Sequence, residues 1–328
     1  MISFVVSIVV SLAVTGIGVP LLTRAGVLDL PNARSSHRDV VPRGGGLGVL
    51  CGVLAGALVA LVATHPVSGR GGQLVAVIAA TLVLAGVGLM DDLRGLPAGI
   101  RLGSQAVVAA ALSLWLALNG HPGGYGVAVV IVGTVWLVAY VNAFNFMDGI
   151  NGISALSAAV AGGWYGWLGY QHQQGVLVVL GLGLAGASLG FLPWNAPLAR
   201  VFLGDVGSYG IGCLLASLAL VAVLSTATLL EAVAPLTVYL ADTGWTLGRR
   251  LCRHEDVREG HREHAYQRLL DVGWMHLPVA AMVATLAALV CVLVQLLAWP
   301  MALLVTVVLL AIYLALPQLV ARGPKVAP

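Results

Sequence analysis

Long apolar runs separated by short polar segments dominate this chain of 328 residues. A helix needs roughly 20 residues to cross a hydrocarbon layer of about 30 Å, and apolar runs of that length recur along nearly the whole sequence. The pattern therefore predicts an all-α integral membrane protein, a bundle of eleven transmembrane helices. The predicted spans are 2–22, 45–64, 73–90, 102–118, 126–143, 152–170, 176–194, 207–224, 228–247, 277–296 and 301–320.

Composition supports a membrane protein and excludes an ordinary soluble domain. Hydrophobic residues make up 59% of the chain and charged residues only 9%, against roughly 25% charged residues in soluble domains. No linker or internal repeat divides the sequence, so residues 1–328 are predicted to form a single membrane domain. The four cysteines show no CxxC spacing, so no disulfide framework or zinc site is indicated.

The distribution of basic residues predicts the orientation, because short loops rich in Lys and Arg stay in the cytoplasm. With the N-terminus outside and the C-terminus in the cytoplasm, 15 of the 16 Lys and Arg residues fall on the cytoplasmic side, and only Arg70 falls outside. Of the 13 acids, all but Glu231 lie on or near that same side. The expected location is thus the inner membrane, and nothing in the net charge of +3 indicates nucleic acid as a partner.

Five polar segments interrupt the apolar pattern, and the predicted orientation opens all five toward the cytoplasm. In the first, Arg38, Arg43 and His37 lie near Gly44–Gly46 at the start of a helix, where backbone N–H groups attract phosphate. A plain basic loop is the alternative. In the last, 249–276, arginines and histidines could clamp a diphosphate, or they could belong to a solvated amphipathic helix at the membrane surface.

The second segment contains adjacent carboxylates, Asp91 and Asp92, at the end of an apolar run. Neighbouring carboxylates repel each other and are costly to desolvate, so such a pair usually shares a cation, holds a basic partner or divides the roles of base and ligand. The alternative is a solvated loop that starts at the helix end and pairs with Arg94. Because two acids do not help membrane insertion, we favour a functional role.

The third and fourth segments carry further oxygen ligands. Asn142, Asn145 and Asp148 are spaced i, i+3 and i+6, so they fall within one arc of a helix and form a polar strip. Their oxygens suit magnesium, and the amides also suit a nucleobase edge, although asparagines can simply join helices. Glycines flank Asp205 and would let a cation or phosphate approach closely, while a plain helix N-cap is the alternative.

Taken in order, these segments resemble those of the polyprenyl-phosphate N-acetylhexosamine-1-phosphate transferases, a family that includes the phospho-muramoyl-pentapeptide transferases. The resemblance extends from about residue 31 to 268. It is carried by the motifs PRGGG, MDD followed by LP and R, NAFNFMDGINGI, FLPWNAP with FLGDVGS, and GHREHAYQRL. The family implies a magnesium-dependent enzyme, with manganese as an alternative ion. It would transfer a sugar 1-phosphate from a UDP-N-acetylhexosamine to undecaprenyl or another polyprenyl phosphate and release UMP.

The resemblance also implies roles for individual residues. Asp205 and Asn145 would bind the metal, Asp91 and Asp92 would position or deprotonate the lipid phosphate, and Asp205 would be catalytic with them. Asp242 matches a further family acid. Contacts to substrate are expected from Arg43, Arg101, Asn142, Asp148, Asn151, Asn195, Arg262 and His264.

Two departures from the family pattern bear on the substrate. Asn151 stands where most bacterial members have a second Asp, and only His261 and His264 stand where the pentapeptide transferases have three adjacent histidines. The resemblance therefore favours the branch that starts O-antigen or other surface polysaccharides, with peptidoglycan synthesis as the alternative. A secondary transporter or a catalytically inactive scaffold would be rival functions. Membrane lipids are expected partners, and a homodimer is one expected assembly.

Overall fold

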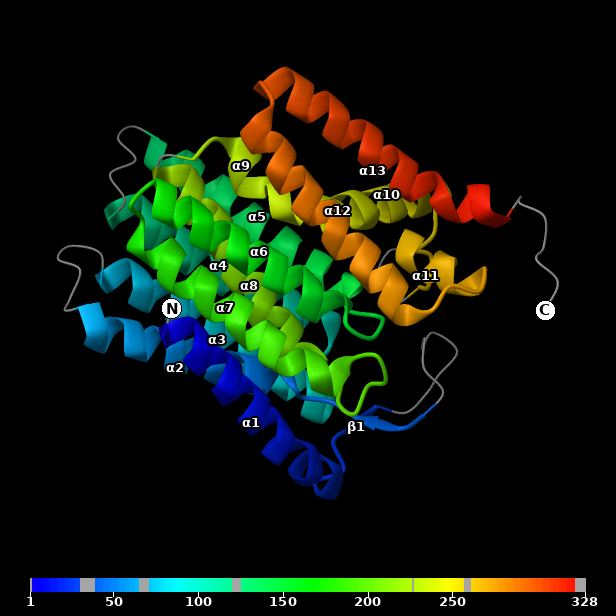
Figure 1. Cartoon of the computed structure of the whole chain (residues 1–328), viewed down its shortest axis with the longest axis horizontal. Helices are drawn as coiled ribbons and strands as arrows, with labels where there is room; N and C mark the ends of the chain where they lie inside the picture. The colour runs from blue at the N-terminus through cyan, green and yellow to red at the C-terminus, as the bar shows by residue number, and fades with distance from the viewer. Residues whose placement is uncertain are drawn as a thin grey trace.

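The apolar runs of the sequence fold into long helices that lie side by side in one bundle (Figure 1). The computed structural model describes residues 2–29, 39–64, 71–119, 125–225, 227–256 and 261–321. Because backbone N–H and C=O groups find no water inside a bilayer, each apolar run satisfies them within its own helix. The long helices are α1 (Ile2–Arg24), α2 (Gly46–Thr64), α3 (Gly71–Arg94), α4 (Ala98–Asn119), α5 (Gly126–Met147), α6 (Ile153–Gln171), α7 (Gly175–Asn195), α8 (Gly204–Ser225), α12 (His276–Leu296) and α13 (Trp299–Ala321).

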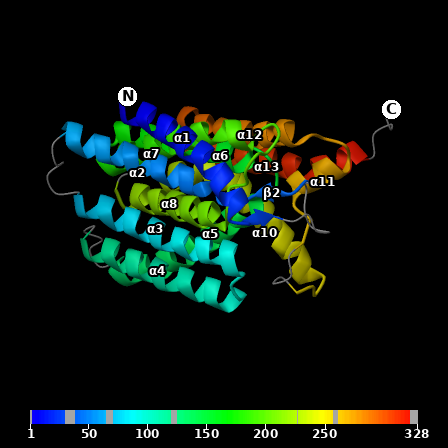
Figure 2. The same cartoon turned by 90° about the horizontal axis from the view of Figure 1, so that it is seen from below.

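The protein is a multi-pass, all-α membrane protein, as its sequence predicts. In the described ranges, eight helices are long and apolar enough to span a membrane: α1, α3, α4, α5, α7, α8, α12 and α13. The predicted count of eleven crossings is not confirmed. The start of α1 and the end of α13 lie at opposite ends of the bundle in both views (Figures 1 and 2). Which end faces the cytoplasm stays a prediction.

The ninth predicted span, 228–247, is not one continuous helix. The chain forms the short helix α9 (Leu229–Val233), the 3-10 turn η2 (Ala234–Leu236) and then α10 (Thr237–Cys252). The side chains of Thr228 and Glu231 each bond the other's backbone N–H and so start α9 as a capping box. Pro235 lies in the 3-10 turn, where its missing N–H is tolerated. Local capping chemistry thus divides a run that hydropathy alone presents as a single span.

Helix α8 lies at the centre of the bundle, and 89% of the residues in its apolar, membrane-spanning stretch are buried. Small residues let its neighbours approach closely, as is common where helices pack in lipid. A Cβ atom on Gly88 of α3 would lie 2.1 Å from the carbonyl oxygen of Asp205, and one on Gly46 would lie 2.2 Å from Cα of Gly207. Residues larger than glycine at these two crossings would push α2 and α3 away from the start of α8.

A small hairpin and a short helix complete the end of the bundle that carries the site. Strands β1 (Leu28–Asp29) and β2 (Val41–Pro42) pair antiparallel, and Arg43 forms an isolated parallel bridge with Phe202 just before α8. Helix α11 (Ala265–Asp271) follows the polar segment after α10. Figure 2 shows β2 and α11 at the same end of the molecule. Segments from both halves of the chain therefore meet there.

Candidate active site

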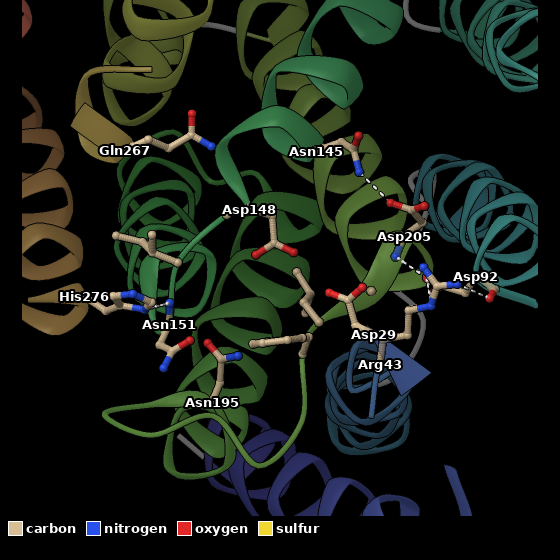
Figure 3. A pocket seen from close by; sticks show the side chains of 15 residues that line it. Asp29, Arg43, Asp92, Asn145, Asp148, Asn151, Asn195, Asp205, Gln267 and His276 are labelled. Carbon is tan, nitrogen blue, oxygen red and sulfur yellow. Dashed lines mark hydrogen bonds and ion pairs between the residues drawn. The ribbon is translucent and has the colours of Figure 1, made fainter. Parts of the chain in front are cut away.

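A cavity of about 270 Å³ opens at this end of the bundle (Figure 3). Side chains from α3, α5, α7, α8, α11 and α12 reach it, together with the hairpin and the loops before α6 and α8. Four carboxylates and a single arginine are among the described residues of its wall. The lining residues are Asp29, Arg43, Asp92, Asn145, Asp148, Gly149, Ile150, Asn151, Asn195, Phe202, Leu203, Gly204, Asp205, Gln267 and His276.

Asp92 joins the end of α3 to the start of α8. Its two carboxylate oxygens accept hydrogen bonds from the backbone N–H groups of Asp205 (3.1 Å) and Val206 (2.9 Å). These N–H groups belong to the first turn of α8 and have no partner within the helix, so a carboxylate there is favoured by hydrogen bonding and by the helix dipole. The first turn of α8 is therefore occupied by Asp92.

Arg43 approaches the same carboxylate from the hairpin side. Its Nε lies 3.6 Å from Oδ1 of Asp92, and its NH2 donates to the Asp92 backbone carbonyl at 2.7 Å. Gly204 allows this crowding, because its φ of +76° suits glycine and an added Cβ would lie 2.7 Å from Oδ2 of Asp92. Asp92, Arg43 and Gly204 thus form one compact wall of the cavity.

Asp205 projects into the cavity from the first turn of α8. Asn145 on α5 donates its amide N–H groups to Oδ1 of Asp205 (2.7 Å) and to Oγ of Ser208 (2.9 Å). In this arrangement the nitrogen of Asn145, not its oxygen, faces the carboxylate (Figure 3). Asn145 therefore orients the Asp205 carboxylate, and its role as a metal ligand stays a prediction.

Asp148 is the residue directly after α5, and its side chain faces the cavity. It accepts a hydrogen bond from the Ser154 hydroxyl at 2.6 Å. Burial raises the pKa of Asp148 to about 6, and the negative charge of Asp92 acts in the same direction, while the Ser154 bond acts against it. A ligand cation in the cavity would favour the ionised form of this carboxyl.

Asn195 and Asn151 shape the loops around the cavity. Asn195, at the end of α7, accepts the Gly152 N–H at 2.7 Å and donates to the Val201 carbonyl at 3.1 Å. Asn151 donates to the Pro197 carbonyl at 3.0 Å. Both line the cavity, and these bonds hold the loops before α6 and α8 against each other.

Five predicted site residues lie outside the cavity lining: Asp91, Arg101, Asn142, Arg262 and His264. Asp91, next to Asp92, is not among the lining residues and accepts bonds from Arg101 (3.1 Å), the Tyr209 hydroxyl (3.0 Å) and the Leu96 N–H (2.7 Å). Asn142 faces α4 and donates to Gln105 at 2.6 Å. Asp91, Arg101 and Asn142 therefore connect α3, α4, α5 and α8 around the site, and Asp91 and Asp92, whose separate roles the resemblance leaves open, differ in their contacts.

The predicted basic clamp is occupied by internal partners. Arg249 lies 3.0 Å from Glu263, Arg253 also bonds Glu263, and Arg262 lies 3.1 Å from Asp271. Burial acts to raise the pKa of Glu263, but the bonds from Arg253 and Arg249 outweigh it, so this pKa is lowered. His264 is buried against Asp242, with 3.1 Å between Nδ1 and Oδ1. Neither Arg262 nor His264 lines the cavity.

Three lining residues with polar side chains escaped prediction from the sequence. Asp29 reaches the cavity because a two-residue strand pairs with β2, and Gln267 and His276 arrive from α11 and the start of α12. Gln267 had a usable signal, since it follows His264 by three residues, the spacing of the capping box that starts α11. The predicted phosphate contacts of His37 and Arg38 lie outside the described residues.

The lining suits a hard divalent cation bound together with a phosphate ligand. Carboxylates outnumber cationic groups, and Mg²⁺ prefers such oxygen ligands. Within the described ranges, no three His, Cys, Asp or Glu side chains are grouped to make a metal cage from protein alone. Mg²⁺ usually takes only one or two carboxylates and completes its shell with water and phosphate oxygens, so the residues present fit an ion of this kind.

Comparison with known proteins finds a family match that covers part of the site. Residues 74–223 match the glycosyl transferase family 4 model. The family 4 region runs from α3 to α8 and contains Asp92, Asn145, Asp148 and Asp205. The hairpin residues Asp29 and Arg43, and the α11 and α12 residues of the cavity, come from outside this region.

Relatives match the chain well beyond the family 4 region. A probable undecaprenyl-phosphate N-acetylglucosaminyl 1-phosphate transferase of Bacillus subtilis is 24% identical over 286 residues, which cover 84% of this chain and 78% of the relative. The decaprenyl-phosphate N-acetylglucosaminephosphotransferase of Mycobacterium leprae is 29% identical over 307 residues, with coverages of 82% and 76%. A phospho-N-acetylmuramoyl-pentapeptide-transferase of Streptococcus mutans is 27% identical over 241 residues, with coverages of 65% and 70%. The resemblance predicted from the motifs is confirmed.

Proposed function

We propose that this chain is an enzyme that transfers an N-acetylhexosamine 1-phosphate from a UDP-sugar to a polyprenyl phosphate and releases UMP. The observation that carries the proposal is the carboxylate-rich cavity at one end of a membrane bundle, where a lipid headgroup and a water-soluble nucleotide can meet. The names of the relatives support polyprenyl phosphate as acceptor and N-acetylglucosamine phosphate as the transferred group. That the donor is a UDP-sugar is our addition, and it defines the reaction as transfer of the sugar 1-phosphate with release of UMP.

In the proposed reaction, an oxygen of the lipid phosphate attacks the sugar-bearing phosphorus of the UDP-sugar. A new P–O bond forms to the lipid phosphate, the bond to the uridine-bearing phosphate breaks, and UMP leaves with the bonding electrons. Phosphoryl transfer of this kind asks a protein mainly for positioning and for stabilisation of charge. Mg²⁺, or Mn²⁺ in its place, would neutralise the diphosphate, and Asp205 is its proposed ligand.

The contacts suggest a division of roles around Asp205. Asn145 fixes the orientation of the Asp205 carboxylate, and Asp92 fixes the first turn of α8 from which Asp205 projects. We assign Asp92 to positioning, because both its oxygens already accept backbone N–H bonds. Arg43 is the cationic group proposed to meet a substrate phosphate. Asp148, with its raised pKa, would face the cation or the donor substrate.

The proposed location is the cytoplasmic membrane, with the N-terminus outside and the cavity open to the cytoplasm. The support comes from the basic residues, since Arg43 lines the cavity and Arg101 bonds Asp91, next to Asp92. The end of α10, which carries Arg249 and Arg250, lies at the same end of the bundle as α11 (Figure 2). The proposed product starts an O-antigen-like surface polysaccharide. Peptidoglycan synthesis is the second candidate, because a pentapeptide transferase is among the relatives.

The test measures UMP release by the purified chain in lipid nanodiscs. Undecaprenyl phosphate and Mg²⁺ are supplied with UDP-GlcNAc, UDP-FucNAc, UDP-QuiNAc or UDP-MurNAc-pentapeptide. We expect UMP from at least one N-acetylhexosamine donor, lost when the lipid is left out or when EDTA removes the metal. Release only from UDP-MurNAc-pentapeptide would select the second candidate. Binding of UDP-sugars without UMP from any donor would refute the enzyme and favour a scaffold.

A further inference from the structure

A buried carboxylate outside the cavity, Asp242 on α10, is surrounded by donors from several elements. Its side chain is fully buried, at 0% exposure. The helix α13 supplies the shortest bond, from the Tyr313 hydroxyl at 2.7 Å. The other donors are His264 Nδ1 (3.1 Å), the Ala265 N–H (3.0 Å), the Tyr266 N–H (3.4 Å) and the Thr246 hydroxyl (3.3 Å).

Such a group is stable only while its hydrogen bonds stay in place. A buried carboxylate that loses a partner bears the desolvation cost of an unsatisfied charge. Among the described residues its ion-pair partner is His264, so most of the stabilisation of Asp242 comes from neutral donors. Two of these donors are backbone N–H groups in the first turn of α11. The position of α11 is therefore tied to Asp242 and, through it, to Tyr313 of α13.

Helix α11 in turn forms part of the cavity. Gln267 lines it, and its side-chain oxygen accepts the His264 N–H at 3.2 Å. The Tyr266 hydroxyl donates to the Phe146 carbonyl at 3.0 Å, and a Cβ on Gly149 would lie 2.2 Å from that hydroxyl. The turn after α5, which carries Asp148, therefore packs directly against α11.

We propose that Asp242 is a positioning residue for the transfer reaction: held by Tyr313, it fixes α11 and thereby places Gln267 and the Asp148 turn in the cavity. The inference rests on the proposed function and deepens it. Asp242 does not line the cavity, so it acts through α11. The outermost helix of the bundle, α13, thus contributes to the substrate site through one hydroxyl group (Figure 1).

The test compares two tyrosine hydroxyls that are equally deep in the protein. Tyr313→Phe removes the hydroxyl that holds Asp242. Tyr165→Phe is the matched control, because the Tyr165 hydroxyl is also buried and donates at 2.8 Å to the Ala232 carbonyl, beside α9 instead of α11. The KM is measured for the UDP-sugar that releases UMP in the unaltered protein. We expect this KM to be about three- to tenfold higher in Tyr313→Phe. The kcat should stay within about twofold, and Tyr165→Phe should change neither value by more than that.

A second comparison separates positioning from general loss of stability. If Tyr313 acts through α11, its effect on KM should shrink to less than half in a Gln267→Ala background, since the positioned side chain is then absent. An equal rise of KM in Tyr313→Phe and Tyr165→Phe, an unchanged KM in Tyr313→Phe, or full additivity with Gln267→Ala would each overturn the proposal.

Hydrogen exchange tests the anchoring without relying on catalysis. The Ala265 and Tyr266 amides should exchange faster in Tyr313→Phe than in the unaltered protein, and at an unchanged rate in Tyr165→Phe. If the unaltered protein releases no UMP from any donor, the proposed function fails. Faster exchange at these two amides would still support the anchoring by Asp242, and unchanged exchange would refute it.

Discussion

The carboxylates of the cavity and three arginines of the segment 249–271, Arg249, Arg253 and Arg262, belong to the same end of the bundle, but the two sets of charges are matched differently. In the segment, Arg249 and Arg253 share Glu263, and Arg262 pairs with Asp271. In the described lining of the cavity, four carboxylates face one arginine. The sequence presents both regions as polar interruptions, and only the contacts distinguish them.

This difference indicates which region serves a ligand and which serves the fold. A charged group is costly to bury unless it has a partner, so a cavity wall in which carboxylates outnumber cationic side chains favours a cation or a charged ligand as a further partner. Arginines that already bond glutamate or aspartate have their partner within the chain. We therefore expect substitutions in the cavity to reduce activity strongly and those in the basic segment to have smaller effects.

The largest expected effect is that of Asp205→Asn. The substitution keeps the shape of the side chain and removes the charge that would hold the cation, so UMP release should fall by about 100- to 1000-fold. The control is Asn142→Ala, a polar residue of α5 that faces Gln105 outside the cavity. Comparable losses in both variants, measured as kcat/KM in nanodiscs, would contradict the central place of Asp205.

The next effect separates the two adjacent aspartates. Asp92→Asn must turn an amide NH2 toward a backbone N–H of α8, because both carboxylate oxygens accept such bonds. The cost of about 2 kcal/mol should appear as a roughly thirtyfold loss of activity, a lower melting temperature, or both. In Asp91→Asn the Tyr209 hydroxyl can turn to donate elsewhere or accept, and we expect a loss several times smaller. Equal losses would refute the division of roles.

The sequence predicts most helices because lipid imposes a length and a composition on them. The hydropathy pattern gives a wrong prediction at 228–247, because it shows one apolar run and does not register the helix caps. Thr228 and Glu231 start a new helix there, and Pro235 falls in the turn that follows. The spacing of Thr228 and Glu231 is a visible capping box, so this break could have been found. A strand of two residues such as Leu28–Asp29 leaves no comparable pattern.

The residues of the site were predictable where an acidic side chain stands at the end of a predicted helix. Asp92, Asp148 and Asp205 meet in one cavity because each lies within a turn of the end of a helix at the same end of the bundle. Direction was not predictable, since Asp91 differs from Asp92 only by about 100° of helical rotation. Whether an arginine serves a ligand or a glutamate depends on contacts between distant segments, which spacing does not reveal.

A smaller effect is expected from the arginines, and it sharpens the comparison directly. Arg43→Ala removes the described cationic side chain of the cavity wall, so the KM for one of the two phosphate substrates should rise about tenfold. Arg262→Ala is the matched control, because it removes the same group from a half-exposed pair with Asp271 and should leave KM within about twofold. A stronger effect of Arg262 than of Arg43 would restore the basic clamp as the phosphate site.

The smallest expected effect concerns His261, the histidine of the basic segment nearest to His264. Burial lowers the pKa of His261 to about 4, and the neighbouring His264 and Arg250 act in the same direction, so the ring is neutral at physiological pH. His261→Gln should therefore leave the dependence of kcat/KM on pH between 6 and 8 unchanged. The protonated His261 ring loses its proton more readily in the folded chain than in the unfolded chain, where the pKa of this histidine is near 6.5. The ring therefore destabilises the fold increasingly as pH falls below about 6.5, and His261→Gln should reduce the loss of thermal stability between pH 7 and 5. A shift of the pH–activity profile in His261→Gln would show instead that this histidine carries charge during the reaction.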